Sequence, residues 1–178
     1  MLLGDGIRVQ AIERDDLQLF TKWLNDPEVR SGLDLYIPLS MAQEERWFEG
    51  LKESPLEEHP LTIEIDTPEG WVMIGNVSLM SIDWRNRSAE IGIFIGEKKF
   101  WGRGHGGKAM LLMMKHGFES MNLNRIFLRV YENNTRAIHA YEKIGFVQEG
   151  KLRQAIFQDG SYHDALIMSL LCSEWKER

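Results

Sequence analysis

The sequence predicts a single α/β domain built on a mixed sheet. Its 178 residues are enough to bury one ordinary hydrophobic core without disulfides. Strand-like alternation occurs both before and after a long apolar segment of helical character. A strand, that helix and a second strand follow one another between Ser88 and Tyr131. This order favours a crossover connection in which the two strands are parallel, or at least adjacent.

The N-terminal region predicts a strand followed by a helix. Ile7–Ile12 forms a short strand-like run. Asp15 or Asp16 is placed to cap a helix that ends before Pro27, because proline disfavours the helical conformation of the residue before it. Apolar residues recur in this helix at helical spacing, namely Leu17, Phe20, Trp23 and Leu24.

A second helix and a hairpin follow. Ser40 and Gln43 form a capping-box pair ahead of an apolar face made of Trp47, Phe48 and Leu51. Residues 27–39, between the two helices, are expected to be a connection, and no individual role is assigned within it. Leu61–Ile65 alternates as a strand, and a Pro-Glu-Gly turn leads into a second strand over Trp71–Met80.

The C-terminal part predicts two more strands around a tight turn. Arg125–Tyr131 reads as a strand, and Asn134 or Thr135 can cap the short helix after it. Gly145 is placed to end that helix in a left-handed turn. Asp159-Gly160 lies between two apolar-leaning runs and predicts a β-hairpin.

Four glycines fall within six residues at the start of the long apolar helix: Gly102, Gly104, Gly106 and Gly107. Glycine lets successive backbone N–H groups turn toward one point, and the helix adds its unpaired N-terminal donors and the positive end of its dipole. We therefore expect an anion site here, most naturally for phosphate.

Two common phosphate-binding motifs fit this loop incompletely. Its glycines match G-x-G-x-x-G, but the acidic residue that a dinucleotide fold needs about 20 positions later is replaced by an apolar and basic strand around Ile126–Val130. Gly102–Lys108 matches G-x-x-x-x-G-K, but Ala109 lacks the hydroxyl that would bind magnesium. A nucleotide hydrolase is thus disfavoured, and a nucleotide-binding oxidoreductase remains the alternative enzyme class.

The loop also fits [Q/R]-x-x-G-x-[G/A] at Gly104-His105-Gly106, with Trp101 where glutamine or arginine is usual. A second block, Asn133–Phe146, matches N-x-[RS]-[AS]-I-x-x-Y-E-K-x-G-F. Together these motifs resemble the GNAT superfamily of acetyl-CoA-dependent N-acetyltransferases. The aromatic-Gly-basic-Gly sequence is most similar to the branch that acetylates ribosomal-protein N-termini and to its small-molecule relatives.

The resemblance implies one GNAT domain over residues 1–178, with a mixed, splayed sheet of about seven strands flanked by about four helices. It implies acetyl transfer from acetyl-CoA to a primary amine by direct attack. The acetyl-CoA-binding residues that it implies are Ile93, Phe94, Ile95, Arg103, Gly104, His105, Gly106, Gly107, Asn134, Arg136 and Lys143.

Two residues are predicted to be catalytic. An alkylamine has a pKa near ~10.4 and is mostly protonated at neutral pH, so a base is required, and Glu90 is the candidate. Backbone N–H groups near Ile93–Ile95 would hold the charge that develops on the acetyl oxygen. The resemblance places Tyr141 beside the thioester sulfur, where it would protonate the departing thiolate. The alternatives are that Glu90 is a solvated edge carboxylate and that Tyr141 is a core aromatic residue.

Gly92, inside the same predicted strand as Glu90, suggests a bulge or a close approach of backbone to another group. A third functional class stays open beside the two enzymes. It is a catalytically silent acyl-CoA-binding regulator, which would keep the glycine loop without the chemistry of Glu90 or Tyr141.

Composition limits the other functions. A net charge of −6 argues against nucleic acid and mildly favours a cationic acceptor. No apolar run approaches about 18 residues, and the first residues lack a signal-peptide pattern. Cys172 is the single cysteine, and the five histidines show no ligand spacing, so no metal is expected.

We therefore expect a cytoplasmic monomer or homodimer. The acceptor is left open among a protein N-terminus, a polyamine, an aminoglycoside and an amino sugar.

Overall fold

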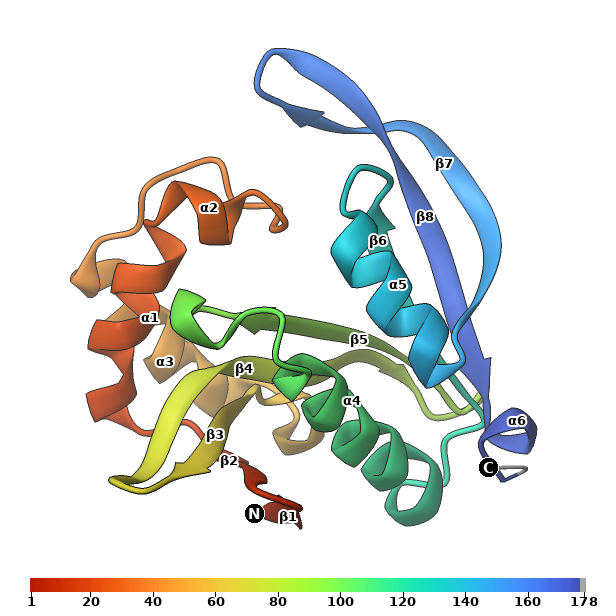
Figure 1. The fold of residues 1–178 in the computed structure, drawn as a ribbon, viewed down its shortest axis with the longest axis horizontal. Coiled ribbons are helices and arrows are strands. Elements are labelled where there is room, and N and C mark those ends of the chain that lie inside the picture. The colour runs from red at the N-terminus through yellow and green to blue at the C-terminus, as the bar shows by residue number, and fades with distance from the viewer. Residues whose placement is uncertain (177–178) are drawn as a thin grey trace. The chain divides into compact units, whose positions relative to one another are not determined.

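The computed structural model describes residues 1–176 and contains a mixed sheet with helices packed on it (Figure 1). Its eight strands run in the order β1-β2-β3-β4-β5-β6-β8-β7. The strands are β1 Leu2–Gly4, β2 Ile7–Ala11, β3 Leu61–Thr67, β4 Gly70–Asp83, β5 Ser88–Ile95, β6 Arg125–Tyr131, β7 Val147–Gln158 and β8 Ser161–Leu171. The helices are α1 Leu17–Leu24, α2 Pro27–Arg30, α3 Met41–Gly50, α4 His105–Lys115, α5 Thr135–Ile144 and α6 Cys172–Lys176. The predicted α/β class with a mixed sheet is confirmed.

The contacts divide the chain into two compact units. Unit 1 consists of Met1–Met80 and Gly92–Met113, and unit 2 consists of Ser81–Ile91 and the chain from Met114 onward. Each unit is built from two separate stretches of sequence. Strand β5 contributes its first half to unit 2 and its second half to unit 1.

Unit 1 begins with four antiparallel strands. β1 pairs with β2, β2 with β3, and β3 with β4. The predicted first strand and the predicted hairpin are therefore confirmed. Strand β1 is an addition that the sequence did not indicate, because three residues are too few for alternation to be recognised.

The start of α1 differs from the prediction. A short 3₁₀ turn, Arg14–Asp16, precedes the helix. The Asp16 carboxylate accepts a hydrogen bond from the Glu13 N–H at 2.8 Å, so it caps that turn and makes no capping bond to α1. Asp16 therefore occupies the expected N-cap position of α1 without a side-chain capping bond, because its carboxylate is used by the 3₁₀ turn.

The region between the two long helices contains a short helix, α2, which was expected to be only a connection. The Asp26 side chain accepts from the Glu28 N–H at 2.9 Å, and Pro27 occupies the first helical turn, where its missing N–H costs nothing. At α3 the predicted capping box is confirmed. The Gln43 N–H donates to Ser40 Oγ at 3.3 Å, and the Ser40 N–H donates to Gln43 Oε1 at 2.8 Å.

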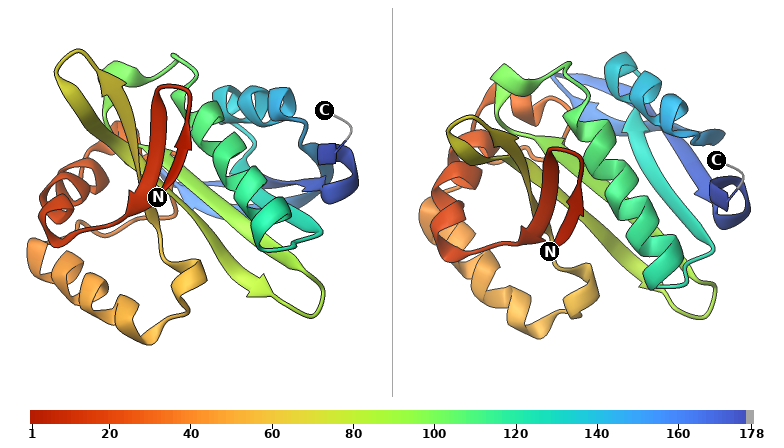
Figure 2. Two further views of the ribbon diagram at one scale, coloured as in Figure 1. Left: turned by 90° about the horizontal axis from the view of Figure 1, so that it is seen from below. Right: turned by 60° about the horizontal axis from the view of Figure 1, so that its bottom comes forward.

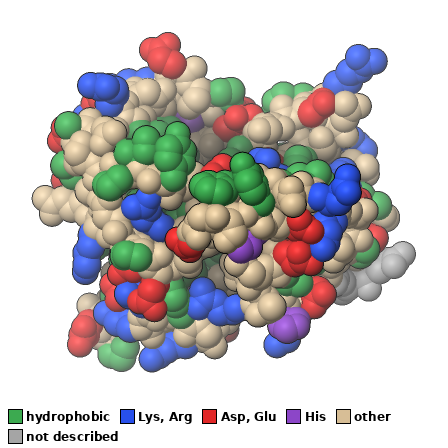
Figure 3. Space-filling view, turned by 90° about the horizontal axis from the view of Figure 1, so that it is seen from above, with side chains coloured by type: hydrophobic (Ala, Val, Ile, Leu, Met, Phe, Trp, Pro, Cys, Tyr) green, Lys and Arg blue, Asp and Glu red, His purple; other side chains and the backbone are tan. Residues whose placement is uncertain are grey.

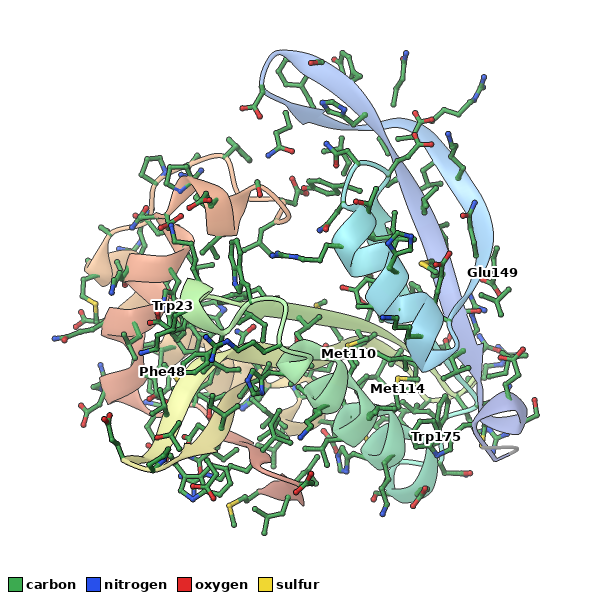
Figure 4. The ribbon with its side chains drawn as sticks, in the orientation of Figure 1. Trp23, Phe48, Met110, Met114, Glu149 and Trp175 are labelled. Atoms are coloured by element: carbon green, nitrogen blue, oxygen red, sulfur yellow. The ribbon has the colours of Figure 1, made fainter. Side chains whose placement is uncertain are left out.

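An aromatic cluster holds α1 against the sheet of unit 1. The ring centroids of Phe20 and Phe94 lie 6.2 Å apart, and those of Trp23 and Phe94 lie 6.4 Å apart. Phe48 of α3 packs against the same cluster (Figure 4). The edge-to-face geometry of these rings adds to the stabilisation from burial alone.

Alternate residues of β5 contact helices on opposite faces of the sheet of unit 1. Phe94 contacts α1, whereas a Cβ atom on Gly106 of α4 would lie 3.7 Å from Ile95 Cγ1 and 3.9 Å from Ile93 Cδ1. Because side chains alternate along a strand, α1 and α4 cover opposite faces, as Figure 2 also shows.

Replacing Gly75 by alanine should destabilise unit 1. A Cβ atom at this position would lie 2.9 Å from Ile95 Cα and still closer to the Phe94 carbonyl oxygen. Both contacts are with backbone, so β4 and β5 would have to separate. We expect the free energy of unfolding to fall by about 1–3 kcal/mol, the usual cost of overpacking, measured by urea denaturation.

The control for this variant is Gly50→Ala at the end of α3, where an added Cβ meets no atom within 4 Å. That variant should be neutral or slightly stabilising, since alanine favours helix over glycine. Equal stability of the Gly75→Ala and Gly50→Ala proteins would contradict the close packing of β4 on β5.

Unit 2 combines parallel and antiparallel pairing. Ser88–Glu90 of β5 pairs in parallel with Arg125–Phe127 of β6, which confirms the predicted crossover through α4. Strand β8 pairs antiparallel with β6 on one side and with β7 on the other. The predicted hairpin turn is confirmed, with φ of 49° at Asp159 and 78° at Gly160, the left-handed pair that asparagine, aspartate and glycine favour.

Helices α4 and α5 end differently. Gly145, with φ of 102°, closes α5 as predicted. The long apolar helix expected after the glycine loop begins at His105 and ends at Lys115, and a π-helical turn, His116–Ser120, follows it. No helix within residues 1–176 is long and apolar enough to cross a membrane.

Candidate active site

The glycine loop has the conformation that an anion site requires. Gly102 and Gly104 have φ of 72° and 83°, a left-handed conformation that side chains disfavour. Helix α4 starts directly afterwards, so the N–H groups of His105, Gly106 and Gly107 have no acceptor inside the helix. The structure thus brings the predicted loop residues together around one helix N-terminus.

Cations surround this helix N-terminus. Arg103 is exposed, with its guanidinium 5.7 Å from the centroid of the Phe100 ring. Lys108 lies in the first turn of α4, where its ammonium donates to the Asp5 carbonyl at 3.0 Å. Burial lowers the pKa of His105, and the neighbouring charges of Lys108 and Arg103 lower it further. His105 is therefore neutral at physiological pH.

The ring of His105 carries an unsatisfied polar atom. Its Nδ1 is buried and has no hydrogen-bond partner among the described residues, and the ring packs edge-on against Phe100 at 5.8 Å. A buried polar atom without a hydrogen-bond partner is energetically costly. A ligand group that binds at the loop would supply the missing partner. These donors and charges fit a pyrophosphate.

The second half of β5 lies in a different environment from the first half. Pairing with β6 stops at Glu90, while β5 continues through Ile93, Phe94 and Ile95. The indole N–H of Trp101 donates to the Ile95 carbonyl at 2.7 Å. Trp101 therefore fixes the loop to the strand, a role that the sequence motif, which expects glutamine or arginine there, did not indicate.

The predicted base Glu90 has an arginine partner. Arg129 Nε donates to Glu90 Oε1 at 2.9 Å, and the Glu90 side chain is only 15% exposed. Because β5 lies between β4 and β6 in the strand order, Glu90 is not on an edge strand, and the alternative of a solvated edge carboxylate does not describe it. The close approach expected at Gly92 is made by a side chain, since an added Cβ would lie 2.6 Å from Met80 Cε.

Asn134 and Tyr141 belong to the start and the last turn of α5. Asn134 caps the helix, with its Oδ1 accepting from the Ala137 N–H at 3.2 Å. Tyr141 lies seven residues later, hence on the same face about 10 Å along the axis. Its hydroxyl makes no hydrogen bond to any residue in the described part of the chain.

Burial raises the pKa of Tyr141 to about 12, so the phenol stays protonated well above neutral pH. Its ring packs against Phe146 at 5.9 Å. The other two predicted residues of α5, Arg136 and Lys143, are exposed. The predicted residues thus fall into two groups, with the glycine loop and the end of β5 in unit 1, and Glu90, Asn134, Arg136, Tyr141 and Lys143 in unit 2.

The surface and the polar side chains give two further findings. On the face shown in Figure 3, basic and acidic side chains are intermixed and do not form one basic patch. No group of three or more histidine, cysteine or acidic side chains gathers as a metal site within the described residues.

A model of the acetyltransferase (GNAT) domain matches residues 7–147. A putative ribosomal N-acetyltransferase of Bacillus subtilis is 30% identical over 172 residues, covering 97% of this chain and 88% of the relative. A spermidine N(1)-acetyltransferase of Vibrio cholerae is 36% identical over 106 residues, covering 60% of this chain and 61% of the relative.

Solved structures are similar over almost the whole chain. A spermidine N-acetyltransferase from Vibrio cholerae in complex with CoA and spermine is 28% identical with a TM-score of 0.87, covering 97% of this chain and 99% of that one. A dodecameric structure of a spermidine N-acetyltransferase from the same organism is 28% identical with a TM-score of 0.79, covering 97% of both chains.

Proposed function

Since this chain belongs to the GNAT acetyltransferase family and is an acetyl-CoA-dependent N-acetyltransferase, we propose that its acceptor is a small polyamine-like alkylamine. The observation that carries this proposal is the similarity over 97% of the chain to an enzyme solved with CoA and spermine. The net charge of −6 supports a cationic acceptor as well.

The glycine loop would hold acetyl-CoA by its pyrophosphate. Arg103 and the N–H groups of His105, Gly106 and Gly107 supply the positive potential, and the His105 Nδ1 is available as a further polar contact. When bound, acetyl-CoA supplies an activated thioester carbonyl. Asn134, Arg136 and Lys143 are proposed to contact the rest of the molecule from α5.

Backbone donors and two side chains would carry the chemistry. N–H groups of Ile93–Ile95, beyond the last pairing with β6, would face the acetyl oxygen where negative charge develops. Glu90 would take the proton from the attacking amine, with Arg129 fixing the carboxylate in place. Tyr141, protonated and without a hydrogen-bond partner among the described residues, would give its proton to the departing sulfur.

We propose that residues 1–178 form one catalytic domain. Unit 1 holds the glycine loop, and unit 2 holds Glu90 and Tyr141. The predicted choice between monomer and homodimer remains a prediction, and sedimentation velocity of the purified protein would decide it.

Glu90→Gln should lower kcat mainly below the pKa of the acceptor, near ~10.4 for an alkylamine, where removal of the proton limits the rate. Raising the pH supplies neutral amine without the base, so the variant should partly recover. The measurements are kcat and kcat/KM against pH for the wild type and the variant.

Glu149→Gln is the matched control for Glu90→Gln. Glu149 is also paired with an arginine of β6, at 2.5 Å from Arg125, but it lies outside the predicted site. The control should retain the wild-type profile. A Glu90→Gln enzyme whose profile also matches the wild type would show that water removes the proton.

The acceptor is tested by mass spectrometry of a panel of amines incubated with acetyl-CoA. The panel contains spermidine, 1,4-diaminobutane, butylamine, an aminoglycoside and a peptide with an N-terminal alanine. Preferential acetylation of the polyamines supports the proposal. Preference for the peptide would favour the second candidate, a protein N-terminus, which the Bacillus subtilis relative suggests.

A further inference from the structure

The chain that leaves β5 turns back and contacts the end of its own strand. The strand ends at Ile95, and we call the six residues that follow, Gly96–Trp101, the return segment. At the end of this segment, the indole Nε1–H of Trp101 donates to the Ile95 carbonyl at 2.7 Å. Trp101 also directly precedes the glycine loop. One residue therefore joins the end of β5 to the proposed pyrophosphate site.

Hydrogen bonds hold the last peptide unit of β5 from two sides. The C=O of Ile95 and the N–H of Gly96 belong to the same peptide unit, and in a trans peptide these groups point in opposite directions. The Gly96 N–H donates to the Ile74 carbonyl of β4 at 2.8 Å. The Ile95 carbonyl therefore points away from β4, and on that side Trp101 is its donor. The peptide unit is fixed between a strand and an indole.

The indole takes the place that a second neighbouring strand has in a complete sheet. Pairing of β5 with β6 ends at Glu90. Beyond that residue, β4 is the neighbouring strand that remains within residues 1–176. A strand end with fewer hydrogen bonds opens more readily than the middle of a sheet. The bond from Trp101 to Ile95 therefore lies where the strand most needs an additional constraint.

The return segment is also held by contacts that do not involve the indole N–H. An added Cβ on Gly96 would lie 2.1 Å from Trp23 Cδ2, so the backbone there packs directly on α1. The Trp101 ring packs against the apolar cluster of α1 and α2. Lys98 Nζ lies 2.8 Å from Asp26 Oδ2, the residue that caps α2. Because these contacts already fold the segment, the indole N–H can be removed without removing its packing.

We propose that Trp101 is a positioning residue for the acetyl-transfer step. Its indole fixes the Ile95 peptide, and with it the Ile95 N–H, which in an extended strand points to the same side as the Ile95 carbonyl. The inference rests on the proposed function, in which N–H groups of Ile93–Ile95 hold the acetyl oxygen. Such donors act only while they stay aligned with the developing charge, so a displacement of about 1 Å is costly.

The test compares two replacements that remove different parts of the indole. Trp101→Phe keeps an aromatic ring for packing and removes the N–H donor. Trp101→Gln keeps a side-chain N–H donor and removes the ring. The control is Trp84→Phe, because Trp84 is 53% exposed in the turn between β4 and β5. The measurements are the melting temperature, kcat, and the Kd for CoA, which lacks the acetyl group.

The two variants should rank in opposite orders for activity and for stability. Trp101→Phe should lower kcat by about 10- to 100-fold, the cost of a misaligned group, and should have the higher melting temperature of the two. Trp101→Gln should have the higher kcat. The Kd for CoA should change less than kcat in both, and Trp84→Phe should match the wild type. If Trp101→Gln has both the lower kcat and the lower melting temperature, Trp101 acts by packing alone and the assignment is overturned.

A second measurement does not depend on acetyl transfer. Hydrogen exchange of the Gly96 amide, followed by NMR, reports on opening of the strand end. In Trp101→Phe this amide should exchange about 5- to 10-fold faster, the effect of losing one hydrogen bond, while amides of β2 keep their rates. If the wild type acetylates no amine, the proposed function fails, and the Gly96 rate still decides whether Trp101 fixes the strand end. An unchanged Gly96 rate in Trp101→Phe would overturn the inference.

Discussion

Tyr141→Phe should lower kcat by about 10²- to 10⁴-fold, the usual range for a lost general acid, while folding and acetyl-CoA binding survive. Phenylalanine keeps the ring and its packing on Phe146 and deletes only the hydroxyl. Because burial raises the pKa of Tyr141 to about 12, the wild-type rate should not fall near pH ~10, where an ordinary tyrosine ionises. The measurements are kcat, its pH profile, the melting temperature and the Kd for acetyl-CoA.

The matched control is Tyr162→Phe, which removes the hydroxyl of a tyrosine that is 64% exposed on β8. It should have wild-type activity. A fully active Tyr141→Phe enzyme would assign Tyr141 to packing alone. If the variant has lost its fold, Tyr141→Phe is repeated at lower temperature, where a marginally stable protein is folded and kcat can be read.

Gly104→Asp should abolish measurable CoA binding. The loop requires φ of 83° at this position, a conformation that a residue with a side chain disfavours. The added carboxylate would also place a negative charge next to the first N–H groups of α4, where pyrophosphate is proposed to bind. Gly104→Asn has nearly the same shape and the same tolerance of this conformation without the charge. The difference between the two variants, measured by calorimetry with CoA, isolates electrostatic repulsion.

The control for strain is Gly70→Asp, at a hairpin turn with φ of 108°. It should bind CoA normally. If Gly104→Asp binds CoA with wild-type affinity, the loop is not part of the CoA site.

Excess EDTA should leave the affinity of the wild type for CoA unchanged, since backbone donors and Arg103 supply the positive potential and Ala109 cannot bind magnesium.

Those parts of the fold were predictable whose physical cause is a local pattern in the sequence. Alternation identified the hairpin of β3 and β4, the Ser40–Gln43 capping box marked α3, and Gly145 and Asp159-Gly160 supplied the left-handed conformations of two turns. The π-helical turn after α4 was not predictable, because no local motif in the sequence marks it, and its Phe118 contacts a residue distant in the chain, Trp175, at 6.0 Å.

The candidate site was predictable only in part, for a related reason. Motifs identified the loop, Asn134 and Tyr141, but Arg129 as the partner of Glu90 depends on strand register. Glu90 is opposite Phe127 in the parallel pair, so Arg129 is the diagonal neighbour on the same face. That relation is visible in the sequence only once the register is known.

Glu44, a buried carboxylate of α3, had a sequence signal that was not used. It precedes Trp47, Phe48 and Leu51 by three, four and seven residues, so it occupies the apolar stripe of α3. A carboxylate in such a stripe is either at the boundary or buried for a reason. Which of the two applies depends on neighbours that are distant in the chain, Phe20 of α1 and Asn76 of β4.

The position of β8 between β6 and β7 has a consequence for synthesis of the protein. The last strand of the chain, Ser161–Leu171, supplies all the antiparallel partners of both β6 and β7. While Ser161–Leu171 is still inside the ribosome, β6 and β7 therefore expose unpaired backbone edges, which are sites for aggregation. Unit 1, which ends at Met113, has already been translated at that stage, so unit 2 is the part exposed to aggregation until β8 emerges.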